Sequence, residues 1–172
     1  MSNAPKAAQE FRAPQPAAEH QVFQKDVGVW DADIQINPGP GAPPIPSKGV
    51  SRTRIACGGL WLISEFHNET TGFEGYGIFG YDPAKGKYVG TWIDPMRTFL
   101  TFYEGSYDAA SKTMTMRAEA EGPQGRRMRW RETTETKDQD TQVWRQFMTG
   151  PNGQEFETMT VTYRRRKYPS KE

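Results

Sequence analysis

The 172-residue chain has little of several features that would narrow its function. One cysteine, Cys57, excludes an intrachain disulfide, and the two histidines, His20 and His67, lie 47 positions apart and do not form a zinc motif. A formal net charge of +1 lacks the basic excess that a nucleic-acid surface usually carries. We therefore predict no metal, no cofactor and no nucleic-acid partner.

Long apolar runs and catalytic motifs are also missing. No stretch of 18 apolar residues occurs, so no membrane span is predicted. The N-terminus lacks the apolar core of a secretory signal, and we favour a cytoplasmic location while leaving the compartment open. G-x-S-x-G is absent, the glycine pattern at 72–77 is followed by no predicted helix, and Cys57 is expected to be a buried structural thiol. The catalytic residues, if any, stay unknown.

The composition favours strands. Hydrophobic residues make up only 35%, whereas aromatic residues make up 12%, so the apolar material is concentrated in side chains that suit a sheet. Seventeen glycines and 13 prolines supply many turns. We predict a disordered leader over 1–15, one domain over 16–166 and a frayed tail over 167–172. Val22, Phe23 and Val27 recur at helical spacing and predict one short helix between Pro16 and Val27, with His20 on its solvated surface.

Everything after that helix is predicted to be strand. The ten candidate segments are 28–36, 48–57, 60–69, 75–82, 87–94, 98–108, 113–121, 126–136, 141–149 and 154–166. Short connectors rich in Asp, Gly, Pro and Asn separate them, as hairpin turns require. The stretch PGPGAPPIP at 38–46 holds five prolines and is predicted to be a long loop between the first two strands.

The same corner is written twice, as FGYDPAKGKYVGTWID from residue 79 and GSYDAASKTMTMRAE from residue 105. A four-residue loop places Asp82 opposite Lys87 and Gly77 opposite Trp92, with Gly86 in the left-handed conformation. The same register pairs Asp108 with Thr113, and Glu104 with Arg117 as an exposed charge pair. Alternation then places five side chains on the inner face: Tyr103, Tyr107, Met114, Met116 and Ala118.

Five short connectors in a row, from residue 82 to 153, predict six consecutive antiparallel strands. Such a meander must protect its edges, and closure into a barrel does so. The predicted fold class is all-β: an antiparallel, mostly up-and-down barrel of about ten strands, calycin-like, with the N-terminal helix over one end.

Several of these motifs resemble a bacterial family catalogued as domain of unknown function 1579, which is grouped with the lipocalin-like calycins. The matching stretches, within about 20–166, are G-x-W at 28–30, GYDP at 80–83, KYVGTWID at 87–94, YEGSYD at 103–108 and TVTYRRR at 160–166. The resemblance implies that Trp30 closes one barrel end and stacks with one of Arg164, Arg165 or Arg166. It implies no activity. The related nitrobindin-like haem barrels use a histidine near the C-terminus, and this chain has none after His67.

Alternation also predicts what faces the barrel interior. The inner residues are Trp92, Asp94, Tyr103, Met116, Trp130, Glu132, Trp144, Met159, Val161 and Tyr163. In the segment RRMRWRE at 126–132 the same alternation turns Arg127, Arg129 and Arg131 outward, which favours a soluble outer face over a nucleic-acid site. Asp94 and Glu132 would be costly inside unless paired, and Arg97, Arg145, a tyrosine hydroxyl or a ligand could pair with them. The alternative places these acids at wet barrel rims.

The candidate pocket residues are Trp92, Asp94, Tyr103, Met116, Trp130, Glu132, Glu65 and His67. Glu65 and His67 share one face of a strand, either inside as an acid–imidazole pair or outside near a loop. The leading hypothesis is a barrel that binds a small, largely apolar molecule. The alternatives are an enzyme that uses an interior carboxylate or His67 as general acid–base, and a filled barrel that acts through its outside or a homodimer contact.

Overall fold

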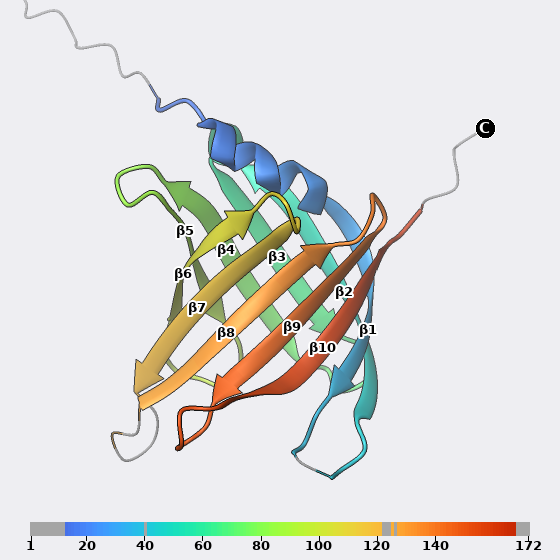
Figure 1. The fold of residues 1–172 in the computed structure, drawn as a ribbon. Helices are drawn as coiled ribbons and strands as arrows, with labels where there is room; N and C mark the ends of the chain where they lie inside the picture. Colours follow the sequence, from blue (N-terminus) through green and yellow to red (C-terminus); the bar gives the residue numbers. More distant parts are fainter. Residues whose placement is uncertain (1–12, 40, 122–124, 126, 168–172) are drawn as a thin grey trace, which may run out of the picture.

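The chain folds into one closed antiparallel barrel (Figure 1). The computed structural model describes residues 13–39, 41–121, 125 and 127–167. Most of the predicted leader and all of the predicted tail except Lys167 lie outside the described residues. Ten strands form the barrel: β1 Gly28–Ile36, β2 Ile45–Ala56, β3 Trp61–Asn68, β4 Glu74–Asp82, β5 Lys87–Ile93, β6 Thr101–Asp108, β7 Thr113–Glu121, β8 Arg127–Thr136, β9 Thr141–Thr149 and β10 Glu155–Arg165.

Each strand pairs with the next along the chain, and β10 closes the barrel by pairing with β1. Trp30 on β1 lies opposite Arg165 on β10, and Ile36 lies opposite Met159 at the other end of that ladder. The predicted all-β, up-and-down architecture is confirmed. Closure leaves no unpaired sheet edge, which a ten-stranded meander would otherwise expose.

Both repeated corners adopt the predicted register. Asp82 lies opposite Lys87, Asp108 lies opposite Thr113, and Gly86 has a φ of 63°. Each aspartate ends its strand by accepting a hydrogen bond from a turn backbone N–H: Ala84 donates to Asp82 Oδ1 at 2.9 Å, and Ala110 donates to Asp108 Oδ1 at 3.0 Å. The repeated Tyr-Asp sequence therefore marks a hairpin turn, because the aspartate accepts hydrogen bonds from backbone N–H groups that have no partner in the neighbouring strand.

The predicted charge pair between Glu104 and Arg117 is wrong, although the two residues do lie opposite each other. Glu104 instead contacts Lys85 at 2.6 Å and Lys87 at 2.8 Å. These two ammonium groups hold the pKa of the Glu104 carboxyl down at about 2. Arg117 pairs with Glu155 instead, with 3.7 Å between Arg117 Nη1 and Glu155 Oε1.

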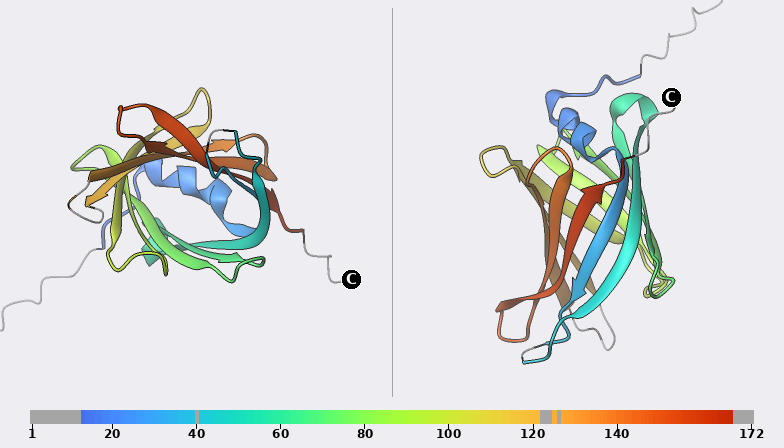
Figure 2. Two further views of the ribbon diagram at one scale, coloured as in Figure 1. Left: turned by 90° about the horizontal axis from the view of Figure 1, so that it is seen from below. Right: turned by 90° about the vertical axis from the view of Figure 1, so that its right-hand side faces the viewer.

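A 3-10 helix, η1 (Ala18–Asp26), lies across one end of the barrel (Figures 1 and 2). Phe23 is buried, and Val22 and Val27 pack against the same core, as predicted. The prediction that His20 is solvated is wrong: only 4% of it is exposed, and its Nδ1 accepts a hydrogen bond from the Ala17 N–H at 3.0 Å. A 3-10 helix has three residues per turn, so His20 lies in line with Phe23 and faces the barrel.

Two further predictions about the β2 region are corrected. β2 begins at Ile45, three residues earlier than expected, and Pro46 lies in register with Gln35. Proline is tolerated there because β3 pairs with β2 only from Gly49 onward, so one side of β2 has no ladder partner at Pro46. Cys57 is exposed, not buried, in a 3-10 turn, η2 (Cys57–Gly59), between β2 and β3.

The core has two parts. The larger one extends from Phe23 of the helix along the barrel and also includes Leu62, Tyr88, Met116 and Trp130. The smaller one lines β1 and β10 and comprises Ala32, Ile34 and Val161. Among the helices of the described residues, none has the length and apolar character needed to cross a membrane.

Candidate functional site

The barrel interior is hollow. A cavity of about 400 Å³ runs between the helix and the opposite barrel end. Large apolar and aromatic side chains form most of its wall, among them Phe66, Phe79, Trp92, Tyr103, Met116, Trp144, Met159 and Tyr163. The polar members are fewer and include Lys25, Asp26, Asp94, Arg97, Glu132, Gln142 and Gln146. This volume and this balance of groups are those of small-molecule sites, and the barrel is not filled.

Most of the predicted pocket residues lie at this cavity. Trp92, Asp94, Tyr103, Met116 and Glu132 line it. Trp130 is buried behind Tyr103 and does not form the wall itself.

Glu65 and His67 do not belong to the cavity. Both are exposed on the outer face of β3, while Leu62, Ser64 and Phe66 occupy the inner positions of that strand. Side chains alternate along a strand, so burying the apolar set turns the acid and the imidazole outward. His67 therefore cannot act on anything bound inside.

A hydrogen-bonded chain crosses the middle of the cavity wall. The Trp130 indole N–H donates to the Tyr103 hydroxyl oxygen at 3.1 Å, and that hydroxyl donates to Glu132 Oε1 at 2.9 Å. Gln146 Nε2 donates to the same Oε1 at 3.2 Å, and Thr158 donates to Gln146 Oε1 at 3.0 Å. Four strands, β6, β8, β9 and β10, contribute to it, so its geometry depends on the folded sheet and not on a single hairpin.

Glu132 has an unusual environment for a carboxyl group. Burial raises its pKa above the ordinary range, and the hydrogen bonds from Gln146 and Tyr103 offset only part of that effect. Burial also raises the pKa of the Tyr103 phenol, with the Glu132 charge adding to the effect. A carboxyl that holds its proton more firmly can donate as well as accept hydrogen bonds toward the cavity.

Asp94 follows β5 at the barrel end opposite the helix. Its side chain is 5% exposed, and Oδ2 accepts hydrogen bonds from Trp92 Nε1 and Arg97 Nη1, each at 3.1 Å. The Arg97 guanidinium also lies 5.2 Å from the centre of the Trp130 ring. Arg97 is thus the partner of Asp94 that the sequence left open, whereas Arg145 faces outward toward Glu135 and Glu157.

Glycines make room for the aromatic wall. A methyl group added at Gly75 would stand 2.1 Å from the Trp92 ring, and one at Gly77 would stand 2.9 Å from it. The pairing of Gly77 with Trp92 is confirmed. Gly75 leaves room for the same ring nearer the barrel end. The indole can lie flat against β4 because that strand lacks side chains beneath it.

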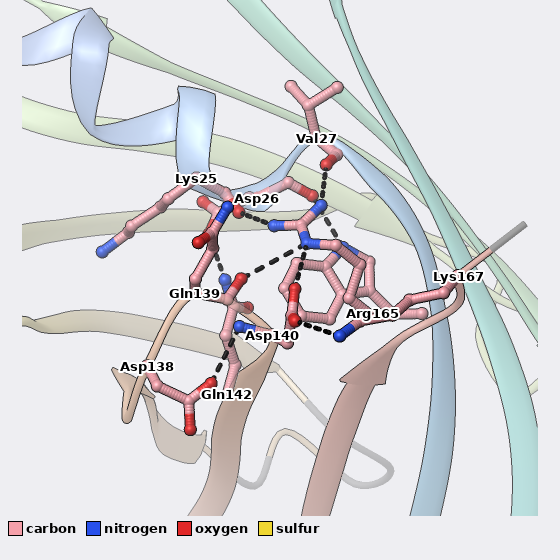
Figure 3. Close-up of polar contacts among 10 residues, drawn as sticks. Lys25, Asp26, Val27, Asp138, Gln139, Asp140, Gln142, Arg165 and Lys167 are labelled. Atoms are coloured by element: carbon pink, nitrogen blue, oxygen red, sulfur yellow. Dashed lines mark hydrogen bonds and ion pairs between the residues drawn. The ribbon is translucent and has the colours of Figure 1, made fainter. Parts of the chain in front are cut away.

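The helix-covered end is held by Arg165 (Figure 3). Its guanidinium lies 4.0 Å from the centre of the Trp30 ring, which confirms the expected stack and assigns it to Arg165. Arg165 also donates to the backbone oxygen of Lys25 at 2.8 Å and to that of Val27, and it contacts Asp140 at 3.3 Å. One side chain therefore ties the helix end, β1 and the β8–β9 turn together.

Sequence reasoning missed the polar groups that η1 contributes. Asp26 accepts a hydrogen bond from Gln142 at 2.7 Å, and burial raises its pKa from 3.8 to about 6. A 3-10 period places Asp26 three residues after Phe23 on the same buried side. The available signal was that period, because His20, Phe23 and Asp26 are spaced by three. Within the described ranges, no three His, Cys, Asp or Glu side chains gather as metal ligands do.

Comparisons with known proteins agree with the fold. The crystal structure of Rv2717c from M. tuberculosis superposes with a TM-score of 0.66 at 12% identity, covering 89% of this chain and 100% of that one. At that identity the likeness concerns the fold alone. No curated protein matches the sequence. The profile of the family described as "Protein of unknown function (DUF1579)" matches residues 15–165, nearly all of the barrel and its helix. The chain belongs to this family of unknown function.

Proposed function

We propose that this barrel binds a small, largely apolar molecule in its interior. The observation that carries the proposal is the cavity of about 400 Å³ with its mainly aromatic and apolar wall. A ligand that fills an apolar space of this size gains hydrophobic burial and van der Waals contacts with its wall. Preformed pockets with few polar groups are the usual sites for such ligands.

In this proposal some cavity residues contact the body of the ligand and others orient its polar groups. Trp92, Tyr103 and Met116 offer ring and thioether surface to the body of the ligand. Glu132 and Asp94 offer polar atoms at two depths, one mid-barrel and one at the end opposite the helix. In this proposal Trp130 is a positioning residue, because it holds the Tyr103 hydroxyl through its indole N–H.

A fluorescence titration with N-phenyl-1-naphthylamine tests the proposal. This probe is neutral and apolar and brightens when it leaves water. Ser64 lines the cavity and carries a small side chain, so Ser64→Phe fills part of the space without adding charge. Ser106→Phe is the matched control, because Ser106 is exposed on β6 and outside the cavity.

Saturable binding by the wild type and by Ser106→Phe, with an affinity loss on the order of tenfold in Ser64→Phe, supports the proposal. Binding that is unchanged by Ser64→Phe would place the probe outside the barrel and overturn the proposal. Far-UV circular dichroism of each variant verifies that the barrel is retained.

A second function, acid–base catalysis within the same cavity, is favoured by one specific observation. Glu132 is buried beside the cavity with a raised pKa, a property common to catalytic carboxyls. Glu132→Gln separates the two functions. A binding protein retains affinity within a few-fold, since the amide keeps an acceptor for Tyr103. An enzyme that turns over a bound substrate would lose its rate with affinity intact.

A further inference from the structure

The Lys25 ammonium group occupies an unusual place at the helix-covered end of the cavity. Lys25 lines the cavity, and its Nζ is buried without a hydrogen-bond partner among the described residues. Nζ lies 4.2 Å from the centre of the Tyr107 ring, so a cation–π contact partly offsets the loss of water around the ammonium group. Figure 3 shows this ammonium pointing away from the contacts that surround Arg165.

Side-chain hydrogen bonds to three successive carbonyl oxygens, those of Lys25, Asp26 and Val27, hold the backbone around Lys25. Arg165 donates to the oxygens of Lys25 and Val27, and the Trp30 indole donates to the oxygen of Asp26 at 2.9 Å. The Thr53 hydroxyl donates to the Asp26 oxygen as well. Lys25 therefore projects from an anchored segment, and its side chain is directed by the fold.

Neighbouring acids do not form an ion pair with Lys25. Asp26 lies near enough for the Lys25 charge to oppose the effect of burial on the pKa of that carboxyl, but the carboxyl is directed to Gln142. No ion pair joins Lys25 to an acid anywhere in the described part of the chain. The other cation at the cavity, Arg97, is already paired with Asp94. A buried cation without a paired anion is costly, so this end of the cavity favours an anionic group.

We propose that the ligand is a small amphipathic carboxylate whose head group pairs with Lys25 Nζ. Its apolar body would extend toward Trp92 and Met96 at the opposite end of the barrel, along the aromatic wall. One ammonium balances one negative charge, which suits a monocarboxylate better than a phosphate dianion in so apolar a site. This inference rests on the proposed function, because it names the ligand class for the same cavity.

Isothermal titration calorimetry with decanoate and decan-1-ol tests this inference. The two probes share a chain and differ in the charge of the head group. Wild type is compared with Lys25→Met, which keeps an unbranched apolar stem, and with Lys87→Met. Lys87 is the matched control because it is an exposed lysine outside the cavity.

We expect the wild type and Lys87→Met to bind decanoate about tenfold or more tightly than decan-1-ol. In Lys25→Met the preference should vanish while decan-1-ol binding remains. The ligand-free Lys25→Met protein should also melt at a higher temperature than the wild type, because an unpaired buried charge has been removed.

Other outcomes separate the inference from the function on which it rests. Equal affinities for both probes in the wild type, or a carboxylate preference that survives Lys25→Met, would overturn the inference and leave a neutral ligand in the cavity. If neither ten-carbon probe binds but N-phenyl-1-naphthylamine does, the inference fails and the proposed function stands. If none of the three binds, both fail.

Discussion

Tyr103 on β6 reaches past β7 to Glu132 on β8, and its hydroxyl donates a hydrogen bond of 2.9 Å to the carboxyl. The two residues are 29 positions apart in the sequence. Their contact fixes the half-buried carboxyl mid-barrel, at the cavity wall. This contact therefore places one carboxyl group in the middle of a mainly apolar cavity wall.

Tyr103→Phe should destabilise the barrel. The substitution leaves the Trp130 N–H without its acceptor and removes one of the donors to Glu132. Buried polar groups left unsatisfied cost about 1–3 kcal/mol, and urea unfolding followed by circular dichroism would measure the loss. Tyr81→Phe is the control, since the Tyr81 hydroxyl makes no hydrogen bond to the described residues. Equal effects of the two substitutions would argue against the network.

Gly75→Ala should disturb the cavity wall. Its methyl group would stand 2.1 Å from the Trp92 ring, so the indole must shift. Overpacking of this kind costs about 1–3 kcal/mol and should weaken binding of N-phenyl-1-naphthylamine. Gly150→Ala is the control, because the nearest atoms there are 3.4 Å away. A Gly75→Ala protein with wild-type stability and binding would show that Trp92 does not rest on this strand.

Arg165→Lys should loosen the helix-covered end even though the charge is kept. An ammonium cannot stack on Trp30 and at the same time donate to two separate carbonyls as the planar guanidinium does. We expect a loss of about 2–4 kcal/mol in the free energy of unfolding. Arg164 pairs with Asp33 on the exposed outer face, and Arg164→Lys should stay within about 0.5 kcal/mol. A comparable loss in both variants would contradict the role of Arg165.

Asp26→Asn should stabilise the protein in a pH-dependent way. Burial raises the pKa of Asp26 from 3.8 to about 6, so the folded state binds this proton more tightly than the unfolded state does. The contribution of Asp26 protonation to the free energy of unfolding is fully present below about pH 3.8 and is lost as the pH rises through about 6. Asparagine has no such loss, so the variant should gain up to about 3 kcal/mol at pH 7.5 and almost nothing at pH 4.

Urea unfolding of both proteins from pH 4 to 7.5 gives the difference directly. Asp33→Asn, which also removes one carboxylate but from the exposed face, is the control. A stability difference that does not change with pH would contradict the burial of an ionisable Asp26.

The sequence was informative wherever a local rule determines the structure. Turn chemistry at Asp82 and Gly86 fixed the hairpin register, and alternation then placed Trp92, Tyr103 and Glu132 inside. The same alternation left Glu65 and His67 undecided, since the sequence does not say which face of β3 closes on the core. Lys25 and Asp26 were missed because their burial depends on a 3-10 period and on contacts with β9 and β10, more than 100 positions away.

Native mass spectrometry tests the central claim most directly. Wild type, Ser64→Phe and Ser106→Phe would each be incubated with an apolar extract of the cells that produce them and compared with their denatured masses. A cavity that binds predicts a non-covalent adduct of small-molecule mass on the wild type and on Ser106→Phe, and its loss from Ser64→Phe. A wild-type protein without any adduct, or equal adducts on all three proteins, would contradict binding inside the barrel.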